Sequence, residues 1–273
     1  MKVSDISELQ EIARRVRLGI IEEVYNAKSG HPGGSLSVAD ILTVLYFNQM
    51  NVDPKEPKAS SRDRLVLSKG HVAPALYSVL AEKGYFEKDE LKNLRKLDGM
   101  LQGHPDMKNI PGIDMSTGSL GQGLSIANGM AIASKLNHEG IRVYCICGDG
   151  ELQEGQIWEA AMTSSHYKLD NLCVIVDNNN LQIDGKVNEV MSIYPIDDKF
   201  RSFGFEVIKI DGHDMNQIIG ALNKAKTVKG KPTAIIAKTV KGKGVSFMEN
   251  EAGWHGKAPK EEEYNVAIKE LEQ

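Results

Sequence analysis

A carboxylate flanked by two glycines follows one of the most apolar stretches of the chain. Gly148-Asp149-Gly150 comes directly after residues 143–147, five consecutive apolar residues that predict a buried strand. In an open parallel sheet, ligands bind beyond the carboxyl ends of the strands, where glycines let the backbone approach a phosphate closely. The carboxylate of Asp149 cannot itself hold a phosphate, but it can bind a cation that bridges to one. The motif therefore predicts a phosphate site that depends on a metal ion.

Amide and carbonyl oxygens follow the next predicted strand, residues 171–177. This strand ends in Asp177, and three asparagines and Leu181 come after it. Mg²⁺ takes about six oxygen ligands and commonly combines one or two protein oxygens with substrate phosphates. We therefore expect Asp149, Asn179 and the backbone carbonyl of Leu181 to bind Mg²⁺ together with a diphosphate. Each segment alone is also typical of an ordinary turn, and only their joint occurrence after two apolar strands favours the metal site.

Four of the seven histidines lie beside glycine or proline in predicted turns: His31, His71, His104 and His255. A neutral imidazole can both donate and accept a hydrogen bond and titrates near the working pH. On the residues alone, a substrate site and simple surface exposure remain open for these four. The other three match no motif, and we expect structural roles for them. They are His138, His166 and His213.

The elements that must position these residues alternate between strands and helices. Strands are predicted at residues 64–68, 143–147, 171–177, 205–210 and 232–239. Helices are predicted at residues 9–24, 37–48, 120–136, 156–168, 195–203, 214–227 and 260–273, with a further helix ending at Gly84. Asp5 is expected to begin the first helix and Ser37 to cap the second. Short, continuously apolar strands indicate an α/β fold: a doubly wound, mainly parallel sheet with helices on both faces.

Two segments lack this regularity. Residues 98–112 contain three glycines and two prolines, and long irregular loops of this kind in compact proteins are usually functional. The basic, glycine-rich segment 238–244 carries three lysines and could attract an anion, but a solvated loop is the favoured interpretation.

Composition excludes several classes of protein. The 273 residues carry a net charge of −4 and are 41% hydrophobic and 26% charged, as in a soluble globular protein. The longest apolar stretches have five residues, far below the ~20 of a membrane span, and the start does not resemble a secretory signal. Mild acidity disfavours nucleic acid as a partner. Three cysteines, Cys145, Cys147 and Cys173, fall in predicted strands, so we expect reduced thiols and a cytoplasmic protein.

Six motifs, taken in order, resemble the transketolase family. They are Ser29-Gly30-His31-Pro32-Gly33, Leu67-Ser68-Lys69-Gly70-His71, Gly103-His104-Pro105, Thr117-Gly118-Ser119-Leu120-Gly121-Gln122-Gly123, Gly150-Glu151-Leu152-Gln153-Glu154-Gly155 and Trp254-His255-Gly256. In addition, Gly148-Asp149-Gly150, then 27 residues, then Asn178-Asn179 is similar to the thiamin diphosphate motif. The resemblance covers nearly the whole chain, but only the amino-terminal, diphosphate-binding part of a full transketolase. Ser119 and the stretch 34–37 depart from the usual motifs, which bears on substrate detail and not on the cofactor.

The resemblance implies thiamin diphosphate and Mg²⁺ as cofactors and two-carbon ketol transfer from a ketose phosphate to an aldose phosphate, as in the pentose phosphate pathway. The metal ligands it implies agree with those above: Asp149, Asn179 and Leu181. The implied cofactor contacts are His71, Gly118, Leu120, Gly148, Asp149, Gly150, Glu151, Asn179, Ile183 and His255. The implied catalytic residues are His31, His104, His255 and Glu154, with Glu154 at a subunit interface near the cofactor's proton path.

In this family a second, pyrimidine-binding domain follows the present one and carries the glutamate that protonates the cofactor. We expect residues 1–273 to form a single diphosphate-binding domain with a helical amino-terminal extension and a helical tail, and the pyrimidine-binding domain to be absent. The expected protein is the amino-terminal subunit of a split transketolase. A separate carboxy-terminal subunit would complete its active sites, in a two-plus-two heterotetramer that uses sugar phosphates and binds neither nucleic acid nor membrane.

Two alternatives of different kinds remain open. Another thiamin diphosphate enzyme, such as a deoxyxylulose-phosphate synthase or the cofactor-binding chain of a 2-oxoacid dehydrogenase, shares the magnesium motif but not this set of histidine motifs. A non-catalytic binding or regulatory subunit would have no need of the metal ligands and the four motif histidines. A Rossmann dinucleotide-binding protein is disfavoured, because the glycine fingerprint is absent after the first strand.

Overall fold

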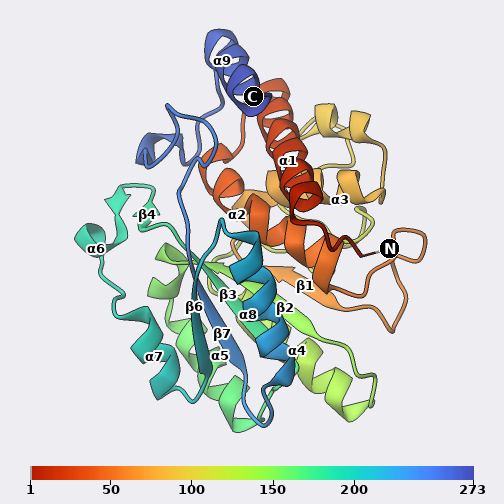
Figure 1. Ribbon diagram of the computed structural model, residues 1–273, viewed down its shortest axis with the longest axis vertical. Helices are drawn as coiled ribbons and strands as arrows, with labels where there is room; N and C mark the ends of the chain where they lie inside the picture. Colours follow the sequence, from red (N-terminus) through yellow and green to blue (C-terminus); the bar gives the residue numbers. More distant parts are fainter. Residues whose placement is uncertain (1) are drawn as a thin grey trace.

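The computed structural model describes residues 2–273, and its centre is a five-stranded parallel sheet (Figure 1). The strands are β1 (Arg64–Leu67), β2 (Val143–Gly148), β3 (Leu172–Asn178), β6 (Glu206–Asp211) and β7 (Thr233–Lys238). Their order across the sheet is β1-β2-β3-β7-β6, and every neighbouring pair is parallel. The doubly wound, mainly parallel sheet expected from the sequence is confirmed, and all five predicted strands form.

Helices cover both faces of the sheet, which explains why the strands are apolar without alternation. On one face, Tyr144, Ile146 and Ile175 pack in a core with four helices. These are α1 (Ile6–Ala27), α2 (Pro32–Val44), α3 (Ala73–Lys83) and α8 (Met215–Thr227). On the other face, Val174 and Val176 pack with three helices. These are α4 (Gly123–Leu136), α5 (Gly155–His166) and α7 (Ile196–Ser202).

The three cysteines are free and completely buried in β2 and β3, as expected. Cys145 and Cys147 face one core and Cys173 faces the other. The last helix, α9 (Glu261–Leu271), lies beside α1 at the top of Figure 1, and the Leu271 carbonyl accepts a hydrogen bond from Arg14. Among residues 2–273, no helix combines the length and the apolar character needed to cross a membrane.

The two helix caps expected from the sequence have different outcomes in the structure. Asp5 caps α1, because its carboxylate accepts hydrogen bonds from the backbone N–H groups of Ser7 and Glu8. The expectation that Ser37 caps the second helix is wrong. α2 begins at Pro32, whose fixed φ suits the first position of a helix, and Ser37 lies inside it.

Shorter elements that the sequence patterns did not indicate join the main ones. They are η1 (Leu45–Gln49), η2 (Gly70–Val72), η3 (Lys88–Asn93), η4 (Gly150–Gln153), α6 (Val187–Val190), η5 (Ala252–Trp254) and the antiparallel pair β4 (Leu181–Gln182) and β5 (Gly185–Lys186). The β4–β5 hairpin follows β3 directly, so it projects from the carboxyl edge of the sheet.

The irregular segment 98–119 is fixed to the sheet edge by a buried carboxylate. Asp114 pairs with Arg62 and with Arg64, and it accepts a hydrogen bond from the backbone N–H of Leu65 at the start of β1 (2.9 Å). At the other end of the loop, the Tyr77 hydroxyl donates to the His104 carbonyl (2.9 Å). These contacts hold the loop in one position although it contains no regular structure.

We expect Asp114→Ala to lower the free energy of unfolding by about 3 kcal/mol, because it leaves the buried guanidinium group of Arg62 without its ion-pair partner. Urea unfolding measures the loss, and amide hydrogen exchange should rise within residues 98–119 first. Asp89→Ala is the control, since Asp89 forms only an exposed ion pair with Lys92. Equal stability of the two variants would contradict the assignment of Asp114 as the anchor of the loop.

Candidate functional site

A cavity of about 350 Å³ opens at the carboxyl ends of β2 and β3. All but one of the site residues expected from the sequence line it. They are His31, His71, Gly118, Leu120, Gly148, Asp149, Gly150, Glu151, Glu154, Asn179, Leu181, Ile183 and His255. The exception is His104, whose ring lies just behind Gly118: a Cβ added to Gly118 would be 3.0 Å from His104 Cδ2. Six distant segments of the chain therefore meet at one place.

Asp149 connects the loop after β2 to the turn after β3. Its side chain is buried, and its two oxygens accept hydrogen bonds from the backbone N–H groups of Gly150 (2.8 Å) and Asn180. Asn180 adopts the left-handed conformation, with φ of 58°, which asparagine tolerates better than most residues. In the same turn, Asn179 Oδ1 accepts from the backbone N–H of Leu181 (3.0 Å). The three expected metal ligands thus share one hydrogen-bonded unit.

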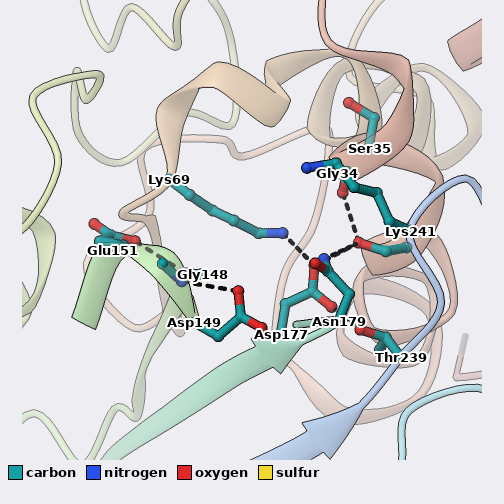
Figure 2. Close-up of polar contacts among 12 residues, drawn as sticks. Gly34, Ser35, Lys69, Gly148, Asp149, Glu151, Asp177, Asn179, Thr239 and Lys241 are labelled. Atoms are coloured by element: carbon teal, nitrogen blue, oxygen red, sulfur yellow. Dashed lines mark hydrogen bonds and ion pairs between the residues drawn. The ribbon is translucent and has the colours of Figure 1, made fainter. Parts of the chain in front are cut away.

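A second carboxylate, Asp177, lies beside this unit at the end of β3 (Figure 2). It is completely buried and accepts hydrogen bonds from Lys69, Ser37 and Thr239. Burial raises the pKa of Asp177, but the Lys69 ammonium and the hydroxyl donors outweigh this and hold the pKa below its ordinary value. Asp149 behaves differently: burial and the neighbouring Asp177 raise its pKa to about 6. A cation bound at Asp149 would relieve both effects.

Glu151 lies under the glycine loops with both oxygens occupied by protein donors. One oxygen accepts from the Ser68 hydroxyl and the backbone N–H of Gly121, and the other accepts from the backbone N–H of Gly148 (3.0 Å). Burial raises the pKa of Glu151. This carboxylate therefore holds three segments of the cavity wall together.

Three imidazoles form a cluster in the lining of the same cavity. The ring centroids of His31 and His71 are 5.1 Å apart, those of His71 and His255 are 5.1 Å apart, and those of His31 and His255 are 5.3 Å apart. Burial is the main cause that lowers the pKa of His31 to about 4 and of His255 to about 3, and it lowers that of His71 well below its ordinary value. All three rings are therefore neutral at pH 7, where each can donate and accept a hydrogen bond.

The cavity also contains two ammonium groups, those of Lys69 and Lys241, which are not among the site residues expected from the sequence. Residues 238–244 were expected to form a solvated loop, and this is wrong for Lys241, which is only 2% exposed. Its Nζ donates to the Leu181 carbonyl (3.3 Å) and to His255 Nδ1 (2.9 Å), and burial lowers its pKa to about 8. Lys69, inside a quoted motif, is equally buried. The one sequence signal that could have placed Lys241 in the cavity is its position in a glycine-rich segment directly after a strand.

The rim of the cavity is more open than its floor. Leu120 is 37% exposed and Ile183 is 69% exposed, so two apolar side chains meet solvent at the entrance. Glu154 is exposed at the start of α5. Of the histidines expected to be structural, His138 and His166 are exposed and do not line the cavity.

The residues present fit a magnesium ion that carries a diphosphate. Within residues 2–273, no three His, Cys, Asp or Glu side chains converge on a metal position. The candidate ligands are the oxygens of Asp149, Asn179 and Leu181, which the turn after β3 holds together. Oxygen ligands of this kind suit Mg²⁺, and the two buried ammonium groups suit a diphosphate. In the described part of the chain, Nδ1 of the lining residue His31 is buried without a hydrogen-bond partner.

Comparison with known proteins agrees with this geometry. Residues 8–272 match the family described as "Transketolase, thiamine diphosphate binding domain". The chain belongs to the transketolase family. It is 47% identical over 265 residues to the 6-deoxy-6-sulfo-D-fructose transketolase subunit of Clostridium sp. (strain MSTE9), which covers 97% of this chain and 96% of that one.

A second relative and a solved structure give the same result. The chain is 45% identical over 264 residues to an apulose-4-phosphate transketolase subunit of Phocaeicola vulgatus, covering 97% of this transketolase-family chain and 93% of the relative. The crystal structure of transketolase from Campylobacter jejuni superposes with a TM-score of 0.91 at 38% identity. That match covers 98% of this chain but 43% of the solved one.

The neutral imidazoles make the stability of the fold depend on pH. His31 and His255 have pKa values of about 4 and about 3 in the folded chain, below the 6.5 of the unfolded chain. As pH falls below 6.5, the unfolded chain binds more protons than the folded chain, so the free energy of unfolding decreases. We expect the free energy of unfolding of the double variant His31→Asn/His255→Asn to decrease less steeply as the pH falls below 6.5. Urea unfolding at several pH values below 6.5, without added metal, measures this decrease.

The matched control for this titration removes two exposed histidines instead. His138→Asn/His166→Asn should keep the wild-type slope, because neither ring contributes to the cavity. Asp149 and Glu151 contribute in the opposite direction, but they are common to all three proteins and cancel in the comparison. Identical slopes in the two double variants would show that the cluster does not hold its rings neutral.

Proposed function

We propose that this chain is the amino-terminal, thiamin diphosphate-binding subunit of a split transketolase. It helps to transfer a two-carbon ketol unit from a ketose phosphate to an aldose phosphate. The observation that carries the proposal is the cavity at the ends of β2 and β3. Oxygen ligands, buried ammonium groups and neutral imidazoles meet there, in a chain that belongs to the transketolase family.

The floor of the cavity is the proposed position of the cofactor's diphosphate. Asp149, Asn179 and the Leu181 carbonyl would hold Mg²⁺, while Lys69 and Lys241 would balance the remaining negative charge. When bound, thiamin diphosphate supplies the electron sink that allows a carbon–carbon bond beside a carbonyl to break and form. At the floor of the cavity, the protein binds and orients the diphosphate, because the acidic and basic side chains there neutralise the charges of the metal ion and the diphosphate.

The imidazole wall is the proposed substrate side. His31 and His71 are neutral, so each ring can donate one hydrogen bond to a sugar hydroxyl group and accept one from it. His255 is also neutral, and because its Nδ1 accepts from Lys241, its Nε2–H can donate to a sugar oxygen. His104 reaches the same side from behind Gly118, and burial and Arg95 lower its pKa as well. The names of two relatives specify a sulfonated and a phosphorylated sugar, which supports an anionic ketose as the donor.

The proposal also includes the residues at the rim of the cavity that are expected to contact the cofactor. Gly118, Leu120 and Ile183 would border the aminopyrimidine and thiazole parts of the cofactor, and Glu154 would lie near its proton path at a subunit interface. Glu151 would act on the cofactor indirectly, by holding Gly148 and the loop at Gly121 in place.

A second kind of chain is part of the proposal. It would supply the pyrimidine-binding domain and the glutamate that protonates the cofactor, in a two-plus-two heterotetramer. Support comes from relatives of almost the same length whose names call them subunits. Exposed apolar side chains at the cavity entrance are consistent with a covering chain. Three buried, unpaired thiols support a reducing compartment such as the cytoplasm.

Removing one negative charge tests the proposal. In the chain reconstituted with the carboxy-terminal transketolase chain from its own cells, thiamin diphosphate should bind only with Mg²⁺. Asp149→Asn should weaken that binding by about 100-fold or more, beyond what the loss of a merely supporting group causes, because the amide lacks the charge that holds the cation. Titration calorimetry measures the binding, and release of the aldose product from a ketose phosphate measures the activity.

Asp198→Asn, on the exposed side of α7, is the control and should bind and react as the wild type does. Unchanged magnesium-dependent binding in Asp149→Asn would refute the metal site. Full ketol transfer by the isolated wild-type chain would refute the need for a second subunit.

A further inference from the structure

Lys241 reaches the cavity from a short segment whose backbone forms hydrogen bonds with other parts of the chain at nearly every residue. This segment, residues 239–243, leaves the end of β7. The N–H of Thr239 donates to the Asn178 carbonyl (3.1 Å), and the N–H of Gly242 donates to the Gly33 carbonyl (2.9 Å). The side chain of Lys241 packs over Gly33, since a Cβ added there would be 3.1 Å from Lys241 Cγ. The position of the Lys241 ammonium therefore depends on the position of this backbone.

Three linked side chains lie outside the cavity, and two of them, Arg17 and His213, bond to the same segment. Arg17 of α1 forms a two-point ion pair with Asp40 of α2, with Nη1 3.0 Å from Oδ1 and Nη2 2.5 Å from Oδ2. Asp40 Oδ2 also lies 2.7 Å from Nδ1 of His213, in the loop before α8. Arg17 is 8% exposed, Asp40 is 5% exposed and the His213 side chain is 14% exposed. We name this row the Arg17–Asp40–His213 clamp.

The two ends of the clamp bond to the segment on either side of Lys241. The backbone N–H of Val240 donates to His213 Nε2 (2.9 Å). Arg17 Nε donates to the carbonyl of Lys243 (3.1 Å). Because Nε2 accepts this bond, the proton of the neutral ring lies on Nδ1 and points to Asp40. Burial raises the pKa of Asp40, but Arg17 and His213 outweigh it and keep the carboxylate charged.

We propose that the Arg17–Asp40–His213 clamp is a positioning device for Lys241, which sets where its ammonium meets the diphosphate without itself touching the cavity. This inference rests on the proposed function. Lysine has a flexible four-carbon stem with considerable rotamer freedom, so a precise placement of the charge requires a fixed backbone and a packed stem. The clamp supplies the first of these and Gly33 supplies the second.

His213→Phe removes the acceptor of the Val240 N–H while keeping a ring of similar shape. In the chain assembled with its partner, we expect the Kd of thiamin diphosphate in the presence of Mg²⁺ to rise about 10-fold, as for other groups that support a ligand. His213→Gln retains an acceptor and should stay within about threefold of the wild type, since one hydrogen bond is restored. If His213→Phe does not fold, Asp40→Asn serves instead, because it removes the charge that fixes the His213 proton on Nδ1.

Coupling to Lys241 separates positioning from general support of the fold. Lys241→Met should weaken binding by itself, and His213→Phe should then add nothing, because both changes remove the same ammonium position. His166→Phe, an exposed ring on α5, is the matched control and should not change the Kd. An additive loss in the double variant, equal losses in His213→Phe and His213→Gln, or wild-type binding by His213→Phe would each overturn the proposal.

A readout without the cofactor keeps this inference distinct from the proposed function. Lys241 is buried, so acetic anhydride should acetylate it slowly, and mass spectrometry of the resulting peptides measures the rate. His213→Phe should accelerate acetylation of Lys241 several-fold and leave that of Lys69 unchanged. If the wild-type complex bound no thiamin diphosphate, the proposed function would be wrong. If His213→Phe left the acetylation rate of Lys241 unchanged, the positioning role of the clamp would be wrong.

Discussion

The buried carboxylate of Asp177 is the constraint on which the rest of the site depends. It lies at the end of β3 with no exposure to solvent, and its partners come from three other segments: Lys69 after β1, Ser37 within α2 and Thr239 after β7. An unpaired carboxylate at such a position costs several kcal/mol, so the folded state requires all three segments in place. Meeting that requirement brings both buried lysine-bearing segments to the turn that contains Asn179 (Figure 2).

The charged side chains around the cavity are not all paired with a group of opposite charge. Within residues 2–273 Asp177 pairs with Lys69, whereas Asp149 forms no salt bridge with a lysine or an arginine. Burial and the neighbouring Asp177 raise the pKa of Asp149 to about 6. Burial, and after it the ammonium groups of Lys69 and Lys241, lower the pKa of the His71 and His255 imidazoles and keep them neutral. A divalent cation at Asp149 and a diphosphate beside Lys241 would together compensate these charges. The same electrostatics that would bind the cofactor therefore also set the protonation of the substrate wall.

The sequence predicted the sheet and the gathering of the motif residues well, because both follow from local patterns. Continuous apolar stretches identify strands buried on both faces, and parallel strands bring residues that follow them, such as Asp149 and Asn179, to one edge. Most of what the sequence patterns did not predict depends on contacts between distant residues. Ser37 was read as a helix cap, yet its hydroxyl bonds to Asp177, 140 residues away, and Pro32 starts the helix earlier. Lys241 sits in a basic, glycine-rich segment, and its burial requires Gly33 and Leu181 from other parts of the fold. The partner of His213, Asp40, is 173 residues distant.

The measurement that tests the account most directly is the position of the metal ion in the assembled protein. Crystals of this chain with its partner, thiamin diphosphate and Mn²⁺ in place of Mg²⁺ would locate the ion by its anomalous scattering. We expect one peak at bonding distance, about 2.0–2.2 Å, from a carboxylate oxygen of Asp149, the amide oxygen of Asn179 and the carbonyl oxygen of Leu181, with diphosphate oxygens completing the shell. A metal ion bound elsewhere, or cofactor bound with the Lys241 ammonium still on the Leu181 carbonyl and no metal there, would contradict it.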